Sequence, residues 1–189
     1  MTATDSTGTD PRDEIVTHLP ALRAFARGLT GNATSADDLV QETVLKAWSK
    51  FDQFRAGTNL RAWLFTIMRN TFLSSRRKSA REVADPEGSF TAQLASKPDH
   101  DGRLAMQEMN AAMRELPLEQ REALLLVGAL GFSIEEAAET CDCAPGTIKS
   151  RANRGRAALA KRLGLDKDDE VLSTDKTVTG VLAAAPSAF

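Results

Sequence analysis

The sequence predicts an all-α protein with two small helical domains joined by a flexible linker. Apolar residues recur at helical spacing in two blocks, residues 13–82 and residues 103–163. The stretch between them, residues 83–102, contains two prolines and two glycines among acidic residues and lacks helical periodicity. No segment alternates polar and apolar residues over the length of a strand, so no sheet is expected.

The two ends of the chain differ from these blocks in composition. Residues 1–12 are rich in Thr, Asp, Ser and Gly, and we expect them to be disordered. Residues 164–189 mix acids with Thr, Ser and Ala, which predicts a flexible tail. The chain contains no apolar run near the roughly 20 residues that cross a bilayer, and its start lacks the basic and apolar regions of a signal peptide. These features predict a cytoplasmic protein without membrane association.

The first block contains a helix that we place from its cap. Ser35 is predicted to cap a helix that starts at Ala36. Its core stripe is predicted to be Val40, Val44, Ala47, Trp48 and Phe51. A second face combines two acids, an amide, a leucine and a serine: Asp38, Gln41, Glu42, Leu45 and Ser49. That composition is equally compatible with a protein-docking surface and with an ordinary solvated face.

A loop at residues 51–59 separates this helix from a basic one. Asn59 is a suitable cap for a helix from Leu60 to about Arg77. The predicted buried stripe is Leu60, Leu64, Ile67, Met68 and Thr71, and the other side carries Arg61, Phe65, Arg69, Leu73, Arg76 and Arg77. Cations mixed with aromatic rings suit a single-stranded nucleic acid, because cations contact phosphates while rings stack on unpaired bases. We expect at least half of the aromatic side chains in this block to serve packing alone.

The second block ends in a helix-turn-helix pattern. Ser133 and Glu136 form a capping box for a short helix to about Cys141, and a second helix begins near Pro145 and stops at Gly164. Ile148, Ala152, Gly155 and Leu159 are predicted to pack against the first helix. The predicted DNA-contacting residues are Lys149, Ser150, Arg151, Asn153, Arg154 and Arg156. A merely solvated basic face is the alternative, but the capped helix and turn favour DNA reading.

Charge is distributed in a way that the whole-chain sum conceals. The formal net charge is −2, whereas residues 55–82 carry seven basic residues against one acid and residues 142–162 carry six against one. Two separate cationic patches therefore favour nucleic-acid binding, because salt screens each charge beyond roughly 10 Å.

Metal, cofactor and catalytic sites are not expected. Cys141 and Cys143 lack partners for a tetrahedral metal site, and we assign them to packing, with a strained redox-sensitive pair as the alternative. His18 and His100 stand near no recognisable catalytic partner. The sequence also has no phosphate-binding glycine loop and no nucleophile elbow.

Three motif blocks, in this order, resemble the extracytoplasmic-function (ECF) sigma factors of bacterial RNA polymerase. The motifs are DDLVQETVLKAW at 37–48, NLRAWLFTIMRNTF at 59–72, and LPLEQREALLL at 116–126 followed by GTIKSR at 146–151 and RGR at 154–156. The resemblance implies a sigma-2 domain at 13–82, a linker at 83–102 and a sigma-4 domain at 103–163. The segment 141–154 is similar to the general-stress-response group of alphaproteobacteria, which a small anti-sigma factor holds inactive.

The resemblance also implies roles for individual residues. Asp38, Gln41, Glu42 and Leu45 correspond to the surface that binds the clamp helices of core RNA polymerase, whose flap is a further contact. The −10 element, as a single strand, would be bound by Phe51, Phe54, Arg55, Asn59, Arg61, Arg69, Arg76, Arg77 and Lys78. The −35 element, as a duplex, would be read by the second helix of the helix-turn-helix. Gly155 and Ala152 depart from the family, where bulkier residues are common, which affects the stability and docking of this helix.

Three other functions compete with this interpretation. A one-domain helix-turn-helix regulator would not need residues 36–82. A sigma mimic that titrates an anti-sigma factor would be expected to lose the basic groups of the reading helix and to carry a phosphoacceptor domain. An enzyme is the third and least supported class.

Overall fold

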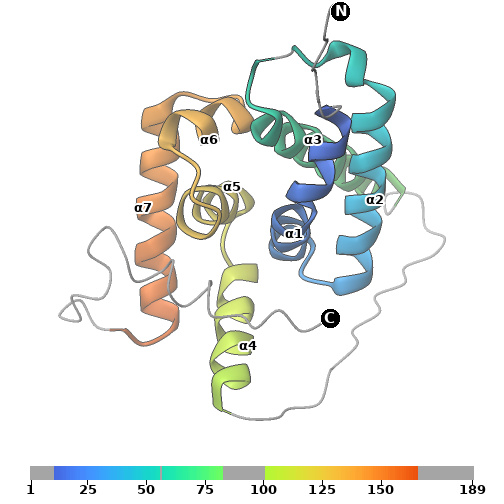
Figure 1. The fold of residues 1–189 in the computed structure, drawn as a ribbon. Coiled ribbons are helices and arrows are strands. Elements are labelled where there is room, and N and C mark those ends of the chain that lie inside the picture. The colour runs from blue at the N-terminus through green and yellow to red at the C-terminus, as the bar shows by residue number, and fades with distance from the viewer. Residues whose placement is uncertain (1–10, 56, 83–100, 166–189) are drawn as a thin grey trace, which may run out of the picture.

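The computed structural model describes residues 11–55, 57–82 and 101–165, and every regular element within them is helical. This confirms the all-α prediction (Figure 1). We call residues 11–82 the first half and residues 101–165 the second half. Residues 1–10, 83–100 and 166–189, which make up most of the segments predicted to be disordered or flexible, lie outside the described residues. The predicted boundaries were wrong by two residues at two places, because residues 11–12 already belong to the first helix and residues 101–102 to the fourth.

Three helices form the first half: α1 (Pro11–Thr30), α2 (Ala33–Ser49) and α3 (Leu60–Glu82). A single 3₁₀ turn, Phe51–Gln53, follows α2. The predicted cap of α2 was wrong, because Asn32 adopts the extended backbone and its side chain accepts a hydrogen bond from the Ser35 amide at 3.1 Å. Ser35 therefore lies inside the first turn. The cap predicted at Asn59 is confirmed, since its Oδ1 accepts from the Ala62 amide at 3.1 Å.

The face of α2 that enters the core differs from the predicted stripe. Trp48, which we placed in the core, is 53% exposed, and Val44 and Phe51 are only partly buried. The buried residues are Ala36, Leu39, Val40, Thr43 and Ala47. A threonine can join this stripe because its hydroxyl donates to the Leu39 carbonyl at 2.7 Å.

In α3 the predicted stripe is largely confirmed, but one aromatic residue was misplaced. Leu60, Leu64, Met68 and Thr71 are buried, and Ile67 is partly buried. Phe65, which we placed among the cations, is fully buried and its ring lies 5.2 Å from that of Phe25.

Four helices form the second half: α4 (Asp101–Arg114), α5 (Leu118–Ala123), α6 (Ile134–Cys141) and α7 (Pro145–Arg162). A wide π-helical turn, Leu124–Ala129, extends α5. The predicted capping box is present at 3.1 Å and 2.8 Å between Ser133 and Glu136. Gly164 follows the end of α7 with φ +67°, a backbone conformation that favours glycine, which confirms the predicted stop.

The two halves pack against each other through one continuous apolar core. Helix α3 lies against α6, and α1 lies against α5 (Figure 1). The ring of Phe65 in α3 is 4.9 Å from the ring of Phe132, which precedes α6. Gly28 of α1 leaves room for the Leu125 side chain, which would come within 2.5 Å of any added Cβ. This contact between halves places the basic side of α3 beside the second half.

Candidate nucleic-acid and protein interfaces

Helix α7 presents its predicted DNA-contacting residues to solvent. Its buried side is Ile148, Ala152 and Gly155, as predicted, with Leu159 partly buried. On the opposite side, the exposed residues are Lys149, Ser150, Asn153 and Arg154, and Arg151 and Arg156 are partly exposed. The packing stripe and the polar face thus follow one helical period, and the second face offers donors to phosphates and base edges.

Local hydrogen bonds orient the guanidinium groups on α7. Arg154 Nη2 donates to Ser150 Oγ at 3.0 Å, and Arg156 Nη1 donates to Asn153 Oδ1 at 3.2 Å. These exposed contacts are weak, so they hold the guanidinium groups only loosely. The helix can therefore supply up to four cations along one groove without breaking its own packing.

The two cysteines fit the packing role. Both thiols are free, and burial, followed by the charge of nearby Glu122, raises the pKa of the Cys141 thiol to about 12. That thiol stays protonated, so it is a poor nucleophile and a poor metal ligand. Cys143 lies 3.8 Å from Arg151 Nη1. Within the described ranges, no three His, Cys, Asp or Glu side chains cluster as a metal site requires.

The second face of α2 is fully available at the surface. Asp38, Gln41, Glu42 and Leu45 are all exposed, and the Leu45 side chain is 71% exposed. Trp48 follows one turn later on the same helix, so two large apolar groups stand in a polar surround. That composition is typical of a protein-docking surface. Sequence reasoning missed Trp48 because its spacing also fitted the core stripe.

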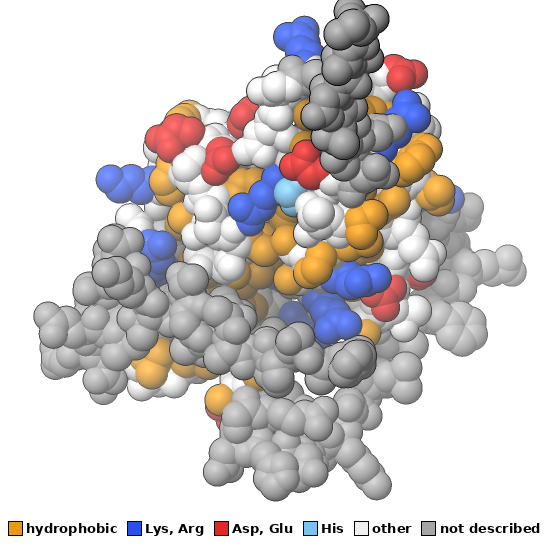
Figure 2. Space-filling view, viewed as in Figure 1, with side chains coloured by type: hydrophobic (Ala, Val, Ile, Leu, Met, Phe, Trp, Pro, Cys, Tyr) orange, Lys and Arg blue, Asp and Glu red, His pale blue; other side chains and the backbone are white. Residues whose placement is uncertain are grey.

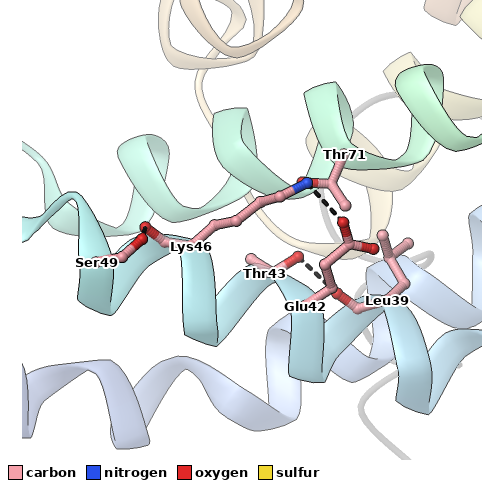
Figure 3. Close-up of polar contacts among 6 residues, drawn as sticks. All are labelled: Leu39, Glu42, Thr43, Lys46, Ser49 and Thr71. Atoms are coloured by element: carbon pink, nitrogen blue, oxygen red, sulfur yellow. Dashed lines mark hydrogen bonds and ion pairs between the residues drawn. The ribbon is translucent and has the colours of Figure 1, made fainter.

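A lysine fixes this helix to its neighbour. Lys46 Nζ donates to Glu42 Oε1 at 2.6 Å and to Thr71 Oγ1 of α3 at 3.2 Å, as Figure 3 shows. Thr71 is buried, so the contact joins the edge of the exposed face to the core. The Glu42 carboxylate is thereby held in place at the surface.

The loop between α2 and α3 contains an aromatic cluster. The Phe54 ring lies 5.2 Å from the Trp63 ring and 5.6 Å from the Phe51 ring. The three rings are partly buried, in line with the expected share of packing, and each keeps some surface exposed. Arg55 is exposed, and its carbonyl accepts a hydrogen bond from the Thr58 hydroxyl at 2.7 Å. The loop is therefore shaped by its own hydrogen bonds and ring contacts.

Three of the residues predicted to bind a single strand make contacts with the second half, and of these only Asn59 is exposed. Asn59 Nδ2 donates to Glu136 Oε1 at 2.6 Å. The Arg61 guanidinium donates to the Leu130 carbonyl and lies 4.3 Å from the Phe132 ring centroid. Arg69 Nε donates to Glu122 Oε2 at 3.1 Å, and their side chains are only 14% and 1% exposed. Arg76, Arg77 and Lys78 remain exposed near the end of α3.

The acids in these contacts differ in electrostatic character. Burial raises the pKa of Glu122, and the charge and hydrogen bond of Arg69 oppose that rise. At Glu136 the Ser133 amide and hydroxyl lower the pKa. Sequence reasoning used Glu136 only as a cap and did not single out Glu122. One signal for Glu122 was its place directly before the apolar run ALLL, which favours burial. A buried acid requires a cationic partner, so the sequence could have indicated an ion pair here.

Comparison with known proteins matches both halves to sigma factors. The family description Sigma-70 region 2 matches residues 15–82, and Sigma-70, region 4 matches residues 106–159. The chain is 52% identical, over 90% of its length and 94% of the relative's, to the ECF RNA polymerase sigma factor EcfG of Rhodopseudomonas palustris. It is 37% identical over 66% of its length to the ECF sigma factor SigC of Mycobacterium tuberculosis, covering 68% of that protein.

A solved structure shows the same fold. The sigma factor RpoE of Bartonella quintana, solved with the anti-sigma factor NepR, matches with a TM-score of 0.75 and 49% identity over 84% of this chain and 99% of that one. None of the described helices is both long and apolar enough to cross a membrane. Two sigma domains in the same order and a close relative over nearly the whole length show that the chain belongs to the ECF family of RNA polymerase sigma factors.

Proposed function

We propose that this sigma factor recognises a promoter at two places, reading the −35 duplex with α7 and binding the unpaired −10 strand with the α2–α3 loop and α3. The observation that carries this proposal is the pair of separated cationic surfaces, one on each half. Lys149 and Arg154 stand exposed on α7, while Arg55 and Arg76 stand exposed around α3. Cations of this kind contact phosphates, and Arg, Lys and Asn pair with guanine and adenine edges in the major groove.

At the −10 element the protein would act on an equilibrium and would make or break no covalent bond. Capturing an extruded base offsets the few kcal/mol that unstacking costs, which shifts duplex DNA toward the open form. The aromatic cluster of Phe51, Phe54 and Trp63 supports this step, because partly exposed rings can stack on unpaired bases. Asn59, Arg61 and Arg69 would take part only after leaving their contacts with the second half.

The exposed face of α2 is proposed to bind the clamp helices of core RNA polymerase. Its acids Asp38 and Glu42 provide charge, and Leu45 supplies the apolar centre that a stable interface needs. Trp48 belongs to the same surface and is added to the residues predicted from the sequence. The second half would contact the polymerase flap.

Regulation by a small anti-sigma factor completes the proposal. It is supported by the 49% identity to a sigma factor that was solved with the anti-sigma factor NepR. We further propose membership of the general-stress-response group, action in the cytoplasm and no enzymatic activity of its own. The sigma-mimic alternative is disfavoured by the intact basic face of α7, since a decoy has no need of exposed Lys149 and Arg154.

The proposal is tested by reconstituting the full chain with core RNA polymerase and selecting promoters from a random DNA library. Selected promoters should share a −35 and a −10 element at fixed spacing, and runoff transcription from them should require the chain. The variant Leu45→Asp should abolish assembly with the core enzyme, whereas Glu108→Gln, on α4, should leave it unchanged. Assembly without start-site choice would contradict the proposal.

A further inference from the structure

A hollow of about 510 Å³ lies between α1 and the loop that precedes α3. Its size falls within the roughly 300–1,000 Å³ of sites that hold small organic groups. Phe54 lines one side, followed along the loop by Thr58, Asn59 and Arg61, and α1 contributes Glu14 and His18. The view in Figure 2 shows acidic, basic and histidine side chains meeting around apolar surface on this face of the molecule. Sequence reasoning assigned no role to the α1 side of this hollow.

On the loop side of the hollow the polar groups are donors that already have partners in the second half or within the loop, although the Arg61 guanidinium keeps further N–H groups. The Asn59 amide donates to Glu136 while its oxygen accepts from the Ala62 amide, and Arg61 donates to the Leu130 carbonyl. The Thr58 hydroxyl donates to the Arg55 carbonyl. Phe54 offers a partly exposed ring for stacking but no polar group.

The α1 side adds a charged acceptor, the Glu14 carboxylate. The Glu14 side chain is 57% exposed, and its carboxylate lies 3.7 Å from His18 Nε2, too far for a hydrogen bond. Within the described part of the chain, His18 Nε2 is buried without a hydrogen-bond partner. The hollow thus combines a flat ring on one wall with an exposed carboxylate beside His18 on the other. A flat ring and a carboxylate acceptor suit a planar group that carries an amino donor.

We propose that Glu14 determines base specificity in this hollow by accepting a hydrogen bond from the exocyclic amino group of an extruded base that stacks on Phe54. The inference rests on the proposed −10 function of the loop and deepens it. Cytosine N4, adenine N6 and guanine N2 are amino donors, whereas thymine has no amino group and flanks its single N3–H donor with the O4 and O2 acceptors, which a carboxylate repels. Glu14 therefore favours a base with an amino group over thymine, and His18 bounds the wall beside it.

The test measures binding of the holoenzyme to pre-melted fork promoters. Each fork carries the −10 strand of a selected promoter with cytosine, adenine or thymine placed at one position at a time. At the position whose base enters the hollow, the wild-type holoenzyme should bind the cytosine or adenine fork about tenfold more tightly than the thymine fork, which is near the low end for a direct base contact. Glu14→Gln should bring that ratio near one and raise affinity for the thymine fork, because the amide can donate to O4. The matched control Glu108→Gln should keep the tenfold ratio.

The outcomes distinguish a failure of the role of Glu14 from a failure of the proposed −10 function. A ratio that Glu14→Gln leaves at its wild-type value, while Phe54→Ala weakens fork binding, would overturn the role of Glu14 alone. Wild-type holoenzyme that binds no fork better than core polymerase does would overturn both the −10 function and the role of Glu14. If Glu14→Gln raised the affinity equally for all forks, the change would reflect only the removal of a negative charge near phosphate. That result would also overturn the role of Glu14 in base specificity.

Discussion

The buried ion pair between the halves gives a prediction whose size and pH dependence can both be worked out. In Arg69→Met the apolar stem is kept, and Glu122, only 1% exposed, loses the cation that lies 3.1 Å away. Removing one partner of a buried pair costs about 3–5 kcal/mol while the remaining group stays charged. We expect a loss of that order at pH 8, measured by urea unfolding followed by circular dichroism and tryptophan fluorescence.

The pH dependence follows from the direction of the Glu122 pKa. Burial raises that pKa, so the ionised carboxylate costs stability. This cost is absent below the ordinary pKa of a glutamate and grows as the pH rises through the raised value. Arg69 offsets the cost, and therefore the gap between wild type and Arg69→Met should widen from pH 5 to pH 8. Protonation relieves the variant by about 1.4 kcal/mol for each pH unit below its own Glu122 pKa.

A double variant provides the control for this prediction. Placing methionine at both Arg69 and Glu122 removes the charge along with its partner, and such replacements are often neutral or stabilising. Its stability should return to within about 1 kcal/mol of the wild type and lose the added pH dependence. Equal losses at pH 5 and pH 8 in the single variant, or a double variant no better than the single, would refute the reasoning.

Three further predictions concern the second half. Arg154→Ala should weaken −35 binding by about 1–3 kcal/mol and relax base preference at one position, whereas a uniform loss across promoters varied base by base would indicate a phosphate contact. Gly155→Ala should lower the free energy of unfolding, measured by thermal denaturation, by about 1 kcal/mol. The added Cβ would lie 2.9 Å from Leu124 Cδ1, and this overpacking costs more than the helix propensity of alanine gains. A stabilised variant would show that the Leu124 side chain moves aside. Glu136→Ala should cost about 1 kcal/mol through the lost capping box and Asn59 contact. Hydrogen bonding lowers the Glu136 pKa, so the stability that Glu136 contributes is present above the ordinary glutamate pKa and is lost as the pH falls through the lowered value. The difference in unfolding free energy between wild type and Glu136→Ala should therefore disappear in acid.

Local signals made the helix-turn-helix predictable from sequence. The Ser133 capping box and the stop at Gly164 each depend on residues a few positions apart, and both were confirmed. The start of α2 was harder, because Asn32 and Ser35 are both good caps and only the backbone decides between them. Trp48 was misplaced since its spacing fitted two faces of one helix.

Contacts between the halves could not be predicted in this way. Arg69 and Glu122 are 53 residues apart, and Asn59 and Glu136 are 77 apart. Helical periodicity identifies which residues share a face, but not which faces meet across a linker. For the same reason the sequence suggested the loop residues proposed for the −10 site but not Glu14 of α1, which we propose as their counterpart.

The shared apolar core has a thermodynamic consequence for assembly. Any complex that pulls the halves apart to reach two distant DNA elements must expose to water the facing sides of Phe65 and Phe132, at a cost of at most about 1.5–3 kcal/mol for each ring. A ligand shifts such an equilibrium only by its differential affinity for the two forms. Core polymerase would therefore have to cover these rings or offset their hydration elsewhere. Part of the binding free energy between polymerase and this subunit would be used to separate the halves, so the measured affinity would be weaker than the contacts alone provide.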